Sequence, residues 1–119
     1  METFPEEYEL LGFFEAEPKL PRAGGELAHS KAVYVNKFGI DEVEFSIEPM
    51  YREIKLKITR DSVPIGKYIL NQVHSVSIVG KNMDTMVVTF EKSAKQRLFK
   101  LRLKPFPQVE WGNEKDNYD

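Results

Sequence analysis

The sequence predicts one mainly β domain, an antiparallel sandwich or a small barrel, that spans residues 1–119. Apolar and polar side chains alternate with period two from about residue 31 onward, as they do in strands that are buried on one face. Turn-forming residues separate the alternating segments at short intervals. The length suits a single domain, since a chain of this size buries roughly two-thirds of its unfolded surface.

We expect roughly seven to nine strands from this alternation. The segments that carry it are residues 31–38, 41–49, 51–60, 63–70, 73–80, 85–92, 97–104 and 108–112. A PH-like barrel is one option for their arrangement. That fold ends in an amphipathic C-terminal helix, whereas here Pro105, Pro107 and the absence of a helical period after them leave no such helix.

Residues 41–49 and 51–60 predict a hairpin that turns at Pro49. A register that closes at Ile47 and Arg52 places apolar side chains opposite apolar ones and charged side chains opposite their counter-ions. The pairs in this register are Phe45 with Ile54, Val43 with Leu56, Glu44 with Lys55, and Glu42 with Lys57.

A second hairpin is predicted around residues 80–84, which have turn chemistry. Its expected pairs are Ile78 with Met86, Val76 with Val88, and His74 with Phe90. The same alternation places His74 on the face of Val76 and Ile78, so we expect a partly buried histidine with a hydrogen-bond partner.

Residues 4–12 fit either a helix or a strand. Thr3 and Glu6 have the spacing of a capping box, which indicates a short helix that ends near Gly12. Tyr8, Phe13 and Phe14 suit a pleated surface, and on this ground we favour the strand. We further expect a long loop at residues 18–30 and a polar C-terminal tail at residues 113–119.

The composition is that of a soluble cytoplasmic protein. The net charge is −2 and cysteine is absent, so no disulfide framework or cysteine metal site is possible. The N-terminal residues lack the basic region of a signal peptide, and no apolar run is long enough to span a membrane. No motif calls for a cofactor or a metal.

Catalysis has little support in the sequence. The two histidines, His29 and His74, lie in no nucleophile or metal-ligand motif. Glu42 and Glu44 would share one face of a strand, but the expected hairpin gives each carboxylate its own lysine, which keeps both ionised. We therefore expect a protein that is not an enzyme.

A basic segment at residues 95–104 is a candidate anion-binding site for a phosphoinositide or a nucleic-acid backbone. Its cations are Lys95, Arg97, Lys100, Arg102 and Lys104. Binders of this kind add exposed aromatic side chains for stacking, whereas Phe99 alternates to the face opposite the cations.

The acidic, aromatic ends of the chain favour a protein partner. The candidate binding residues are Glu6, Glu7, Glu9, Glu15 and Trp111. Carboxylates speed the encounter with a basic partner and aromatic side chains anchor it, as in an inhibitor or immunity protein. Anion binding is the alternative, and a carrier of a small apolar ligand is a third possibility. The oligomeric state is left open.

Overall fold

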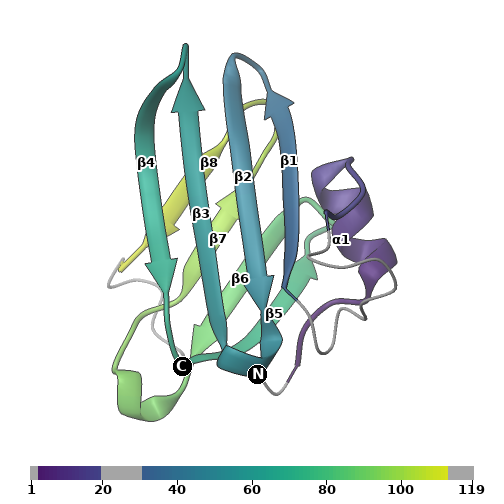
Figure 1. Ribbon diagram of the computed structural model, residues 1–119. Coiled ribbons are helices and arrows are strands. Elements are labelled where there is room, and N and C mark those ends of the chain that lie inside the picture. Colours follow the sequence, from purple (N-terminus) through teal and green to yellow (C-terminus); the bar gives the residue numbers. More distant parts are fainter. Residues whose placement is uncertain (1–2, 20–30, 113–119) are drawn as a thin grey trace.

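The computed structural model describes residues 3–19 and 31–112, in which eight strands form two antiparallel sheets. The first sheet has the order β1 (Ala32–Phe38), β2 (Asp41–Glu48), β3 (Glu53–Arg60) and β4 (Val63–Leu70). The second has the order β5 (Val73–Val79), β6 (Thr85–Phe90), β7 (Phe99–Arg102) and β8 (Gln108–Trp111). Figure 1 shows the first sheet in front of the second. The predicted antiparallel sandwich is confirmed, and the two sheets stay separate instead of closing into one barrel.

The core lies between the sheets and is built by the inward side chains of the alternating strands. In β2 and β3 these are Val43, Phe45, Ile47, Ile54, Leu56 and Ile58, all of them buried. Burying one such side chain contributes about 1.5–3 kcal/mol. The inward side chains of the second sheet occupy the same core cluster, which argues against the apolar-ligand carrier.

The β2–β3 hairpin exists, but its predicted register is wrong by two residues. Phe45 pairs with Leu56, and Glu44 pairs with Lys57. The chain turns later than expected because Pro49–Tyr51 form a short 3-10 helix and Arg52 takes a left-handed conformation with φ of 53°. A shift of two residues keeps every side chain on its face, so the alternation alone does not reveal it.

The β5–β6 hairpin has the predicted pairs Ile78 with Met86 and Val76 with Val88. The prediction for His74 is wrong, because the ladder shifts between Val73 and Ser75 and Val73 pairs with Phe90. This irregularity turns Val73 into the core and His74 toward solvent.

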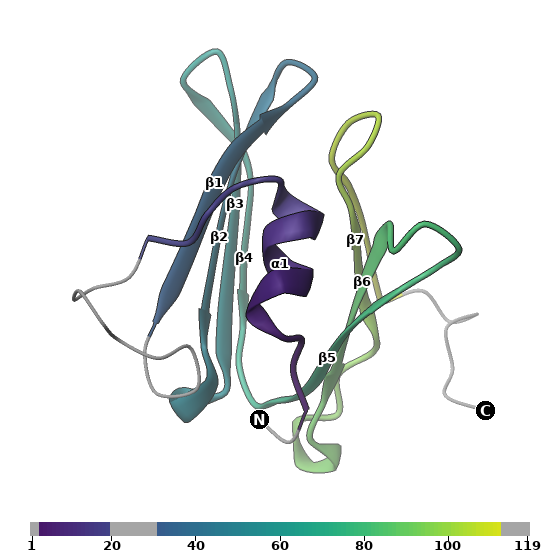
Figure 2. The same ribbon diagram turned by 90° about the vertical axis from the view of Figure 1, so that its right-hand side faces the viewer.

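The predicted N-terminal strand is a helix, α1 (Glu7–Phe14). Its buried residues Leu10, Phe13 and Phe14 have the i, i+3, i+4 spacing of a helix face, and this spacing prevails over the strand preference of the aromatic side chains. Figure 2 shows α1 between the two sheets, at the edge where β1 and β5 lie.

Short bridges on either side of α1 fasten the N-terminal segment to both sheets. Thr3 bridges to Ser75 of β5, and Lys19 bridges to Val33 of β1. Most of the predicted loop at residues 18–30 and the whole predicted tail at residues 113–119 lie outside the described residues.

Candidate functional site

The outward face of α1 and its flanks form an acidic surface with two exposed apolar side chains. We define the helix surface as Glu6, Glu7, Tyr8, Leu11, Gly12 and Glu15. Tyr8 is 74% exposed and Leu11 is 40% exposed. An exposed tyrosine beside carboxylates is typical of a protein-binding surface. The sequence signal for Tyr8 and Leu11 is their position opposite the buried stripe, which becomes visible only once the segment is read as a helix.

A local hydrogen bond caps the start of α1, and two hydrogen bonds from β1 hold its end. The Glu9 carboxylate accepts a hydrogen bond of 3.0 Å from the backbone N–H of Glu6 and so satisfies a donor at the helix start. At the other end, the Asn36 side chain of β1 donates to the carbonyl oxygens of Phe14 at 3.0 Å and Glu15 at 3.1 Å. These bonds bring the helix surface into a defined position against β1.

The four predicted acidic residues lie together on α1 and its flanks, but they have different roles. Glu9 caps the helix, and Glu15 forms an ion pair with Lys104. Glu6 and Glu7 are exposed and form no ion pair with the described residues. The Glu6 side chain also takes part in the capping box of α1, so Glu6 and Glu7 offer a partner their negative charge, which no cation of the described residues neutralises.

Trp111, the fifth predicted residue, lies at the opposite edge of the sandwich, where β4 faces β8. Its ring lies 5.7 Å from that of Phe99, 6.2 Å from Phe90 and 6.4 Å from Tyr68. Its indole N–H donates to the Arg97 carbonyl oxygen at 3.1 Å. Trp111 is 38% exposed, and its contacts join β8 to the edge of the first sheet. The structure thus separates Trp111 from the acidic residues.

The predicted basic residues do not form one patch. Lys100 lies 3.8 Å from the Glu110 carboxylate, Arg102 donates to the Thr85 hydroxyl at 3.1 Å, and Lys104 pairs with Glu15. The remaining two cations, Lys95 and Arg97, line a hollow of about 470 Å³ together with Lys92 and Phe90. Phe99 is buried, as predicted. The aromatic side chain beside these cations is instead Phe90, which stacks on Trp111.

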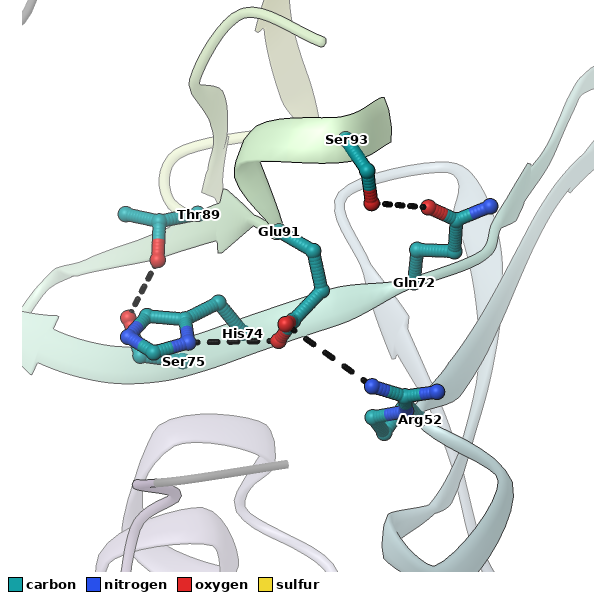
Figure 3. A network of polar contacts seen from close by, with 7 residues as sticks. All are labelled: Arg52, Gln72, His74, Ser75, Thr89, Glu91 and Ser93. Carbon is teal, nitrogen blue, oxygen red and sulfur yellow. Dashed lines mark hydrogen bonds and ion pairs between the residues drawn. The ribbon is translucent and has the colours of Figure 1, made fainter. Parts of the chain in front are cut away.

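A polar network ties the two sheets together at the end of the sandwich that carries the β4–β5 connection. Figure 3 shows the Glu91 carboxylate between His74 and Arg52. Its oxygens lie 3.2 Å from the His74 ring nitrogen and 3.8 Å from the Arg52 guanidinium. The backbone N–H of Glu91 donates to the Gln72 carbonyl oxygen at 2.8 Å. His74 is therefore part of the polar network that joins the two sheets. The other histidine, His29, lies outside the described residues.

Three of the described titratable groups, Tyr34, Asp41 and Arg60, have shifted pKa values, and hydrogen bonds to Asp41 raise the pKa of Arg60. Burial, with a smaller effect from the Glu7 charge, raises the pKa of Tyr34 to about 12. Hydrogen bonds from Arg60, at 2.8 and 3.1 Å, hold the pKa of the buried Asp41 carboxyl below its usual value against the opposing effect of burial. The Asp41–Arg60 pair joins β2 to β3 and lies outside the helix surface.

Within residues 3–19 and 31–112, no group of three or more histidine, cysteine, aspartate or glutamate side chains is arranged to hold a metal ion. The same residues contain no helix of the length and apolar character that a membrane span requires.

Comparison with known proteins adds one structural match. No protein family model and no curated protein sequence matches this chain. The fold is similar to a chain of a solved structure described as a contact-dependent growth inhibition toxin–immunity protein complex from Klebsiella pneumoniae 342. The match covers 93% of this chain and 96% of that chain, with a TM-score of 0.74 and 25% sequence identity.

Proposed function

We propose that this chain is an immunity-type protein, which binds another protein and neutralises it. The observation that carries the proposal is the match to a chain of a toxin–immunity complex over 93% of the present chain. A match of this extent includes both sheets, so it concerns the whole sandwich and not a single hairpin. In this role the protein acts by covering its partner, without a reaction of its own, and we place it in the cytoplasm.

The helix surface supports this proposal. Tyr8 offers a large amphipathic side chain, Leu11 adds apolar area, and Glu6 and Glu7 add negative charge that is not neutralised within the described residues. This combination suits a basic partner, because unpaired carboxylates steer the encounter and a tyrosine anchors the contact. Trp111 is not included, since its ring is used to close the opposite edge.

The proposal is tested by capture followed by reconstitution. The tagged chain is incubated with a lysate of the organism that encodes it, and the captured protein is then expressed in a bacterial host. We expect that protein to arrest growth when expressed alone and growth to recover when this chain is co-expressed. The proposal is wrong if the captured protein leaves growth unchanged, if co-expression gives no recovery, or if this chain arrests growth by itself.

A second candidate function is the binding of an anionic ligand, and one observation favours it. Lys92, Lys95 and Arg97 line the same hollow, with Phe90 beside them. Salt-dependent retention on a polyanion column should be lost in the variant Lys95→Ala with Arg97→Ala. It should persist in the control Lys100→Ala with Arg102→Ala, whose cations already have partners in the second sheet. Absence of retention at low salt removes this candidate.

A further inference from the structure

A hollow of about 280 Å³ opens beside the helix surface. α1 contributes Gly12 and Phe13 to its lining, the turn between β5 and β6 contributes residues 82–84, and the segment after β7 contributes Leu103 and Lys104. Pockets for small-molecule ligands usually measure about 300–1,000 Å³. The hollow lies just below that range, and its size suits one long side chain of a partner.

Gly12 leaves one wall of this hollow without a side chain. Apart from the adjacent residues and the backbone of α1, a Cβ atom added at Gly12 would have no heavy atom within 4 Å, so the position has room for a side chain. The backbone of Gly12 does not have the left-handed conformation that favours glycine. Glycine inside a helix is destabilising relative to alanine, and neither packing nor backbone geometry accounts for it here. The missing side chain instead leaves space for a group from outside.

The lining of the hollow combines the apolar side chains of Phe13, Met83 and Leu103 with the polar side chains of Asn82, Asp84 and Lys104. Phe13 and Leu103 are buried, and Met83 is 47% exposed. The Asp84 carboxylate accepts a hydrogen bond of 3.0 Å from the Thr85 hydroxyl through one oxygen, and it forms no ion pair with the described residues. Gly80 leaves room for this carboxylate, because a Cβ atom at that position would overlap it.

The lining also contains one cation, Lys104, which does not neutralise the Asp84 carboxylate by an ion pair. Lys104 pairs with Glu15, so its charge is already matched by a carboxylate of the helix surface. A side chain with an aliphatic stem, for contact with Phe13, Met83 and Leu103, and a cationic head, for Asp84, fits this mixed lining. Arginine has both, and its guanidinium can donate two parallel hydrogen bonds to one carboxylate.

We propose that this hollow receives an arginine side chain of the basic partner. The inference rests on the proposed function, and it names the contact by which the helix surface recognises that partner. Glu6 and Glu7 guide the cationic face toward α1, and the arginine then enters between Gly12 and Asp84.

A probe that needs no partner tests the hollow directly. N-acetyl-arginine amide is titrated into the full-length ¹⁵N-labelled protein while backbone amide signals are followed by NMR. We expect saturable shifts at Gly12 and Asp84 with a dissociation constant of about millimolar order, which is reasonable for a ligand of this size. The citrulline analogue, which has the same shape but no charge, should bind at least about tenfold more weakly because it cannot form the charge-assisted pair.

Three variants separate the hollow from general effects on the fold. Gly12→Leu should abolish the arginine-induced shifts without lowering the melting temperature, because leucine favours a helix and fills the space. Gly12→Ala is the matched control, with a gain in stability and binding retained. Asp84→Asn, which can still accept the Thr85 hydrogen bond, should weaken arginine binding by about tenfold or more.

Equal binding of arginine and citrulline, the absence of saturable shifts at Gly12 and Asp84, or unchanged binding by Gly12→Leu would overturn the inference. The outcome is independent of the growth assay. A failure of the titration leaves an immunity function intact with a different contact, and a failure of the growth assay leaves an arginine-binding hollow that serves another partner.

Discussion

The hydroxyl of Tyr34 lies inside the core, where the tyrosine ring stacks on Phe14 at a centroid distance of 5.1 Å. The side chain is fully buried, and its oxygen has no hydrogen-bond partner among the described residues. A buried hydroxyl without a partner loses its hydrogen bonds to water and forms none in the protein, which lowers the free energy of unfolding by about 1–3 kcal/mol. The ring of Tyr34 therefore stabilises the core by packing, whereas its hydroxyl destabilises the fold.

We expect Tyr34→Phe to raise the free energy of unfolding by about 1 kcal/mol, since it removes this hydroxyl and keeps the ring stacking. Urea titration at neutral pH measures the change, and Tyr51→Phe, at an exposed position, should have no effect. A loss of stability in Tyr34→Phe would show that the hydroxyl is well satisfied in solution.

The substitution Tyr34→Phe should also remove the part of the alkaline loss of folding stability that is linked to the tyrosine hydroxyl. The folded-state pKa of Tyr34 is raised from 10.0 to about 12, so the folded protein keeps a proton that the unfolded chain releases. The stability linked to this group is complete below about pH 10 and is lost as the pH rises toward 12. Unfolding measured between these pH values should show a smaller decline in Tyr34→Phe than in the wild type. Parallel declines would contradict the raised pKa.

At the scale of elements, the sequence predicts strands well and their connections less well. Alternation identifies all eight strands of the described residues, although β4 and β8 are mostly exposed and lack the clear buried face that strands such as β2 and β3 have. It does not identify the β2–β3 register, which depends on the left-handed Arg52, or the irregularity that reverses His74. The N-terminal segment fits both a helix and a strand in sequence, because its aromatic side chains suit a strand. The sheet edges that α1 covers are formed by residues distant in the chain, so local sequence does not show them.

β4 is an edge strand of the first sheet, in which it pairs with β3. Val63, Ile65 and Ile69 are exposed on it, and Lys67 lies between the two isoleucines. Lys67 pairs directly with Lys57 across the ladder. Like charges in this position are destabilising, whereas a lysine on an edge strand hinders pairing with another chain.

Two substitutions at Lys67 separate these effects. Lys67→Glu places a carboxylate opposite Lys57 and should raise the free energy of unfolding by about 0.5 kcal/mol, an effect that decreases at about 1 M salt. Lys67→Ile also removes the repulsion but makes the exposed stripe continuous, so sedimentation velocity should show more self-association than in the wild type. If Lys67→Ile does not associate more than the wild type, the lysine does not protect this edge.

At the scale of the whole molecule, contacts between residues that are distant in the chain decide where the surfaces lie. α1 closes one edge of the sandwich, the rings around Trp111 close the other, and the Glu91 network joins the sheets at one end. The sequence predicts one surface for the acidic residues and Trp111, because both ends of the chain are acidic and aromatic. The fold places α1 and Trp111 at opposite edges, and no local pattern carries that information.

The charge of α1 should therefore act separately from the net charge of the protein. In the variant Glu6→Lys with Glu7→Lys, association with the protein captured in the growth assay should slow by about tenfold at low salt, and the difference should shrink as salt screens the charges. Circular dichroism checks that α1 persists, because cations are unfavourable at a helix N-terminus. The matched control, Glu42→Lys with Glu48→Lys, changes the net charge equally on strand β2, where neither carboxylate has an ion pair with the described residues. Stopped-flow measurements on both variants decide the point: equal slowing would assign the steering to net charge, and unchanged rates in the α1 variant would exclude a steering role for Glu6 and Glu7.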